Sequence, residues 1–160
     1  MAAYQQVHNY LSTHYEGMDP EQLILLLFNG AISHLRLTRE GIKENDVKKK
    51  GESLSKAIAI ISELNASVDS KMDDESTRFL RGLYTAILAE LTKVTLNNDL
   101  KTLDQAEAYM SKLKEIWEKD VIAKKKKSKD RASKESVNRG SSPSAFKENI
   151  APNTFHSFSV

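Results

Sequence analysis

An all-helical domain followed by a basic tail is the fold class that the sequence predicts. Only three prolines occur in 160 residues, at positions 20, 143 and 152. Between the first two, Leu, Ile and Ala recur at steps of three and four residues, the spacing that places side chains on one face of a helix. Charge separates the two parts, since residues 1–122 carry 15 basic and 19 acidic side chains and residues 123–160 carry 9 and 3. We therefore expect a helical domain over 1–122 and a flexible basic tail over 123–160.

The first long helix is predicted from Pro20 to about Asn45. Asp19 is suited to cap a helix, and proline fits the first helical position, where its missing N–H is not needed. Apolar residues then recur from Ile24 to Ile42. Asn and Asp at 45–46 favour a break, after which the same periodicity predicts a helix over about 47–66.

Two further helices follow with the same signals. Acidic residues at 73–75 favour the start of a helix that carries apolar residues from Leu80 to Val94. Asn97-Asn98-Asp99 interrupts the pattern, and a last helix is predicted to end near Val121. Short polar turns between long helices favour an antiparallel up-down four-helix bundle, with a short N-terminal capping helix before it. The residues assigned to the bundle core are Leu27, Ile61, Tyr84 and Trp117.

The sequence contains no motif that indicates catalysis. Cysteine is absent, the six glycines form no phosphate-binding loop, and no His-carboxylate pattern has metal-ligand spacing. Four glutamates on different helices lie off the apolar stripes and are expected in solvent: Glu40, Glu63, Glu90 and Glu107. We therefore predict no catalytic residue, no metal site and no cofactor. Without a signal-peptide pattern or an apolar run of membrane-spanning length, a cytoplasmic protein is expected.

Some apolar residues are not accounted for by one bundle seam. They are Leu25, Ile32, Ile60, Leu88 and Leu96. Such a surplus fits a groove for a partner helix, but it fits equally well a surface that the N-terminal helix covers.

The lysine run at 124–127 allows a second interpretation of the whole chain. A helical adaptor could use this tail to attract nucleic acid or an acidic membrane surface. A solubilising tail accounts for the same composition. No aromatic residue is interleaved with the run, so stacking on single strands is not supported.

Several collinear segments resemble the FliS family of flagellin export chaperones. The N-terminal part resembles it in Ala3-Tyr4-Gln5-Gln6 and in Asp19-Pro20-Glu21-Gln22-Leu23-Ile24 running into Leu27-Phe28-Asn29-Gly30-Ala31. Further matches are Leu54-Ser55-Lys56-Ala57, Ile60-Ile61-Ser62-Glu63-Leu64, Leu83-Tyr84, Asn97-Asn98-Asp99, Leu103-Asp104-Gln105-Ala106-Glu107 and Ile116-Trp117. The likeness covers residues 3 to about 120, and the tail from residue 123 is longer than the family usually has.

The resemblance implies a cytoplasmic chaperone and not an enzyme. Its client would be the disordered C-terminal segment of flagellin, kept from premature polymerisation and delivered to the flagellar type III export gate. Some family members also bind a regulator or a co-chaperone. The resemblance implies neither a nucleic-acid partner nor stable membrane anchoring.

Site residues follow from the resemblance and from the apolar surplus. Tyr4 matches the family's N-terminal tyrosine, and Val7 lies in the same segment, which is implicated in binding the client and covering the empty groove. Ile32, Ile60 and Leu88 are expected to line the groove. We also expect the apolar end of the tail, residues 146–160, to fold back on the groove or to dock a second partner.

Overall fold

The computed structural model describes residues 5–6, 9, 16–68 and 73–139, and these residues contain helices and no strand. The long helices are α2 (Pro20–Lys43), α3 (Val47–Ser67), α4 (Glu75–Asn97) and α5 (Leu100–Trp117). A π-helical segment, η1 (Glu118–Ile122), precedes α6 (Ala123–Arg139). The chain divides into two compact units, with the division between Ile122 and Ala123.

Acidic caps start three of the four long helices. The side chains of Asp46, Asp74 and Asp99 accept hydrogen bonds from the backbone N–H groups of Lys49, Thr77 and Lys101. Asp19 was expected to do the same for α2, but its side chain makes no capping bond, and the helix begins with Pro20 at its first position. Asn45 and Asn98 have positive φ angles of 55° and 52°, which end α2 and α4 in the left-handed conformation that Asn tolerates.

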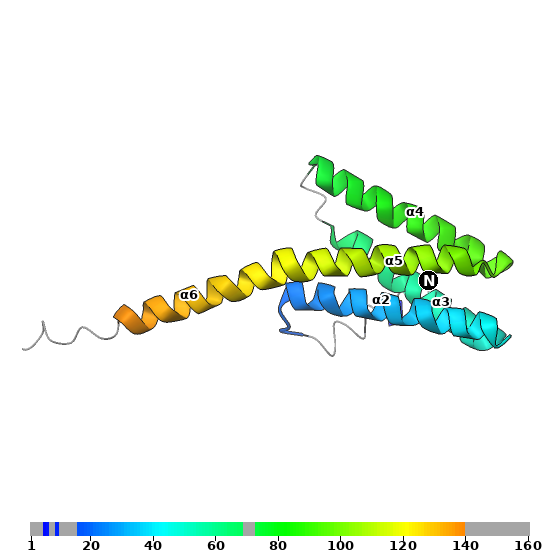
Figure 1. Cartoon of the computed structure of the whole chain (residues 1–160), viewed down its shortest axis with the longest axis horizontal. Coiled ribbons are helices and arrows are strands. Elements are labelled where there is room, and N and C mark those ends of the chain that lie inside the picture. Colours follow the sequence, from blue (N-terminus) through cyan, green and yellow to red (C-terminus); the bar gives the residue numbers. More distant parts are fainter. Residues whose placement is uncertain (1–4, 7–8, 10–15, 69–72, 140–160) are drawn as a thin grey trace, which may run out of the picture. The chain divides into compact units, whose positions relative to one another are not determined.

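One apolar core joins the four long helices. α2 packs against α3 and α5, and α4 packs against the same two helices (Figure 1). Fully buried side chains come from every one of them, among them Leu35, Ile61, Leu91, Leu103 and Met110. Leu27, Ile61 and Tyr84 are buried as the periodicity predicts, and Trp117 packs against the same core with part of its side chain exposed.

Two close contacts join helices near the connection between α2 and α3. Gly41 is buried, and a Cβ placed on it would lie 2.6 Å from the backbone nitrogen of Lys50. Nζ of Lys50 donates hydrogen bonds to the carbonyl oxygen of Thr95, 2.9 Å away, and to Oδ1 of Asn98. A single residue of α3 therefore lies against the backbone of α2 and caps the C-terminus of α4.

The structure corrects two boundaries of the sequence prediction. The last helix of the first unit ends at Trp117 rather than near Val121, and η1 follows it. The predicted flexible tail begins with the helix α6. Its composition explains the error, because the Lys, Arg, Ala and Glu that argue against an apolar core are also good helix formers, and no Gly or Pro occurs between 123 and 139. Residues 146–160, expected to dock elsewhere, lie outside the described residues.

Candidate functional site

An open apolar pocket of about 850 Å³ lies where residues of α2, α3, α4 and α5 approach one another. Its lining residues are Ile24 and Phe28 from α2, Leu64, Ser67 and Val68 from α3 and its C-cap, Glu75, Ser76, Thr77, Phe79, Leu80 and Tyr84 from α4, and Leu113, Ile116 and Trp117 from α5. In the view of Figure 1, the ribbon of α4 diverges from that of α5 toward residue 75 and approaches it near residue 97. The pocket is thus lined by the N-terminal half of α4, where the two helices diverge.

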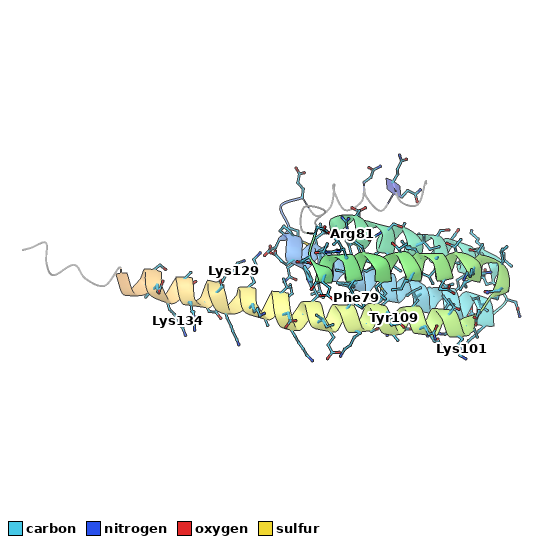
Figure 2. All side chains as sticks on the ribbon, turned by 90° about the horizontal axis from the view of Figure 1, so that it is seen from above. Phe79, Arg81, Lys101, Tyr109, Lys129 and Lys134 are labelled. Atoms are coloured by element: carbon cyan, nitrogen blue, oxygen red, sulfur yellow. The ribbon has the colours of Figure 1, made fainter. Side chains whose placement is uncertain are left out.

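Two large apolar side chains of the pocket remain in solvent. Phe79 is 70% exposed and Ile116 is 46% exposed, although both belong to helices that pack on the core. Phe79 is labelled in Figure 2. Beneath them, Phe28, Leu64 and Tyr84 form a buried floor. Burial raises the pKa of the Tyr84 hydroxyl further above its ordinary value, at which the hydroxyl is already neutral at physiological pH. The pocket offers a mostly apolar surface that a partner's apolar side chains can cover, with Glu75 as its one acidic lining residue.

Polar contacts fix the walls of this pocket. The indole N–H of Trp117 donates to the carbonyl oxygen of Glu21, 2.9 Å away. The guanidinium of Arg81 donates to the carbonyl oxygen of Val68 at 3.1 Å, which connects α4 to the end of α3. The backbone N–H of Thr77 donates to Oδ1 of Asp74 at 2.7 Å and lowers the pKa of that carboxyl. Each wall is therefore anchored at a helix end.

A second surface, between α2 and α5, is polar. Glu107 accepts from Arg36 at 2.7 Å and from Arg39 at 2.6 Å, and Arg39 also contacts Asp104. Burial alone would raise the pKa of Glu107, but the hydrogen bonds from Arg36 and Arg39 outweigh it and lower that pKa. Glu107, expected in solvent, has a side chain that is only 15% exposed. Its partners come from another helix, so the periodicity of its own helix carries no signal for them.

The predicted site residues do not gather at the apolar pocket. Ile32 and Ile60 are buried in the core, and Leu88 is partly buried against it. Ile60 packs over α2 at Gly30, where a Cβ would lie 3.2 Å from its Cδ1, and Ile32 lies beside the polar surface. The side chains of Ile32 and Ile60 are therefore not on an exposed surface in this structure. Tyr4 and Val7 lie outside the described residues.

Sequence reasoning missed Phe79 and Ile116 as surface residues. Each stands one position away from a residue of the predicted apolar stripe, Leu80 and Trp117 respectively. Apolar residues that widen a stripe in this way are the available signal, but the same pattern also occurs in helices that are buried on two sides. Only the divergence of α4 from α5 decides whether such residues are exposed or buried.

Within the described residues, no group of three or more His, Asp or Glu side chains could hold a metal ion. Nor does that part of the chain contain a helix both long and apolar enough to span a membrane. A helical fold with an exposed apolar pocket is typical of a protein that binds a partner through an apolar surface.

Comparison with known proteins agrees with that class and narrows it. The family model described as flagellar protein FliS matches residues 2–126. The flagellar secretion chaperone FliS of Salmonella typhimurium is 38% identical over 99 residues, 61% of this chain and 73% of that protein. The protein of the same name from Escherichia coli is 34% identical over 104 residues, covering 64% and 76%. The flagellar secretion chaperone FliSB of Pseudomonas aeruginosa is 30% identical over 118 residues, covering 74% and 92%.

The chain belongs to the FliS family, which consists of chaperones and not of enzymes. The match includes all four long helices and ends at residue 126, so most of α6 lies beyond it.

Proposed function

We propose that this protein is a cytoplasmic flagellar secretion chaperone that binds the disordered C-terminal segment of flagellin. Binding keeps the segment from polymerising prematurely, and the complex is delivered to the flagellar type III export apparatus. The observation that carries the proposal is the open apolar pocket, in which the side chains of Phe79 and Ile116 are exposed. The pocket belongs to a chain of the FliS family, whose members are secretion chaperones.

Binding and release of the client by such a chaperone require no bound nucleotide. An amphipathic segment that is disordered when free exposes apolar side chains, which self-associate unless another surface buries them. A pocket with a buried apolar floor covers them and lets the segment gain helix as it binds. Transfer to the next partner then releases the client by mass action.

We propose that α2 to α5 form an antiparallel up-down bundle, because the connections at 44–46, 68–74 and 98–99 are short. A short N-terminal capping helix would carry Tyr4 and Val7 and contact the client. When no client is bound, this helix would cover the client-binding pocket. In this arrangement the client and the N-terminal segment compete for one surface.

Ile32, Ile60 and Leu88 belong to the same proposal as secondary contacts. Ile32 and Ile60 are buried in the chain without a client, so a client reaches them only if the side chains that cover them move. Leu88 is partly exposed and needs no such movement. We therefore rank the residues of the apolar pocket above these three.

Titration calorimetry with a peptide from the C-terminus of the host's flagellin tests the proposal. We expect one-to-one binding with a negative heat-capacity change. Phe79→Ser should weaken the affinity by roughly 10- to 100-fold, the effect of losing a well-buried aromatic anchor. Tyr4→Ala tests the contribution of the N-terminal segment in the same assay.

Leu96→Ser is the matched control for Phe79→Ser. Leu96 is also on α4 and is 89% exposed, but it does not line the pocket. Its substitution should leave the affinity unchanged. Failure of the wild-type protein to bind the peptide would refute the choice of client, and equal losses in the two variants would refute the choice of surface.

A further inference from the structure

The apolar pocket has one charged side chain at its edge. Among the described residues that line the pocket, Glu75 is the single charged one, and it is exposed in the first turn of α4. None of the cations in that part of the chain forms an ion pair with its carboxylate. Arg78 pairs with Asp73 at 3.1 Å, and Arg81 donates to the carbonyl oxygen of Val68. Neither arginine lines the pocket.

The start of α4 does not need Glu75 as a cap. Asp74 already fills that role, because its carboxylate accepts from the backbone N–H of Thr77 at 2.7 Å. The helix dipole favours an acidic residue in the first turn, but it does so on every side of the helix. The dipole therefore does not explain why this carboxylate lies at the pocket.

Glu75 and the exposed ring of Phe79 lie on the same face of α4. They are four residues apart, which brings their Cβ atoms to about 5–6 Å and separates them by one helical turn. Both line the apolar pocket, and Phe79 is 70% exposed. A carboxylate without an ion-pair partner and a large apolar side chain are thus adjacent parts of one surface.

We propose that Glu75 binds a lysine or arginine side chain of the client, while Phe79 and Ile116 contact a neighbouring apolar side chain. This inference rests on the proposed function, in which a client segment occupies the pocket, and it specifies the chemistry of that segment. Because one helical turn separates Glu75 from Phe79, a client that becomes helical contacts both with a basic residue three or four positions from an apolar one.

The contribution of Glu75 is to selection more than to affinity. Apolar contacts discriminate poorly among segments of similar hydrophobicity, whereas a charge at the edge of the surface favours an opposite charge and repels a like one. Because Glu75 is exposed, salt screens its pair with a client cation. Loss of the pair should therefore weaken binding only about two- to fivefold.

Calorimetry with the full-length chain and the C-terminal peptide of the host's flagellin tests this inference at about 50 mM and about 500 mM salt. We expect E75Q to bind the peptide about two- to fivefold more weakly at low salt and as well as the wild type at high salt. E90Q is the matched control, because Glu90 is an exposed residue of the same helix that does not line the pocket. It loses the same charge and should bind as the wild type does.

A double-mutant cycle identifies the residue of the client that Glu75 contacts. Each lysine and arginine of the peptide is replaced in turn by glutamine. One replacement should weaken binding to the wild type by the same factor as E75Q and should have no further effect on binding to E75Q. A merely structural role of Glu75 in α4 would weaken the binding of every peptide alike.

Three results would overturn the role of Glu75: unchanged affinity in E75Q, equal losses in E75Q and E90Q, or no coupling to any basic residue of the peptide. In each case, a loss of affinity in Phe79→Ser would still support the pocket as the client's site. Failure of the wild-type chain to bind the peptide would overturn the proposed function and this inference together.

Discussion

The indole N–H of Trp117 donates to the carbonyl oxygen of Glu21 at 2.9 Å, which joins the last turn of α5 to the first turn of α2. These residues are 96 positions apart in the chain. The same indole also forms part of the wall of the apolar pocket. One side chain therefore connects the packing of the fold to the shape of the site.

Trp117→Phe should separate the hydrogen bond from the apolar packing. The phenyl ring keeps most of the apolar contact, but the carbonyl oxygen loses its donor, so we expect a loss of about 1 kcal/mol in the free energy of unfolding. Urea unfolding followed by circular dichroism measures this loss. A variant as stable as the wild type would show that water satisfies the carbonyl equally well.

Gly41→Ala should destabilise the protein through the close approach of α2 and α3. The new Cβ would lie 2.6 Å from the backbone nitrogen of Lys50, and backbone cannot move aside as a side chain can. We expect a loss of about 1–3 kcal/mol in the free energy of unfolding, measured by the same denaturation.

Gly51→Ala is the control for Gly41→Ala. Gly51 lies within α3, and a Cβ there meets nothing within 4 Å. Because Ala favours the helix over Gly by about 0.5–1 kcal/mol, this variant should be more stable than the wild type. A similar loss in both variants would mean that the contact with Lys50 is not the cause.

Glu107→Gln should remove one source of acid sensitivity. The pKa of Glu107 is lowered in the folded chain, so its ion pairs contribute fully above the pKa of the unfolded carboxyl, and that contribution is lost as the pH falls through the folded pKa. At neutral pH the variant should lose about 1–2 kcal/mol in the free energy of unfolding. Unfolding free energies measured across the acid range should converge for the two proteins, and a constant difference would contradict the assignment.

His34 should contribute a pH dependence nearer neutrality. Burial, and then the charge of Lys56, lower the pKa of His34 in the folded chain. The unfolded chain therefore binds the proton first, and stability should fall as the pH drops below about 6.5, the usual histidine pKa. His34→Gln should flatten this part of the curve. An unchanged slope in the variant would assign the dependence to another group.

The positions of the helices could be predicted because their signals are local. Asp74 and Asp99 begin α4 and α5 as capping residues, and Asn98 ends α4, each within a turn of the helix that it delimits. Each signal needs only its neighbours in the sequence.

The site could not be predicted in the same way, because it depends on how helices meet. Ile32 and Phe79 are both apolar residues on helices, yet one is buried and the other is 70% exposed. The angle between α4 and its neighbours decides this, and no local pattern encodes that angle. The burial of Glu107 could not be predicted for the same reason, because Arg36 and Arg39 approach it from a different helix.

The apolar pocket draws its lining from four helices, so an occupant would act as a cross-link among them. A ligand that binds only the folded chain adds its binding energy to the fold, about 2.7 kcal/mol at a concentration 100 times its Kd. Amide hydrogens at the N-terminus of α4 and the C-terminus of α3 should then exchange with solvent more slowly when the pocket is filled. In a chaperone of this design, the client would complete the part of the core that the four long helices leave open.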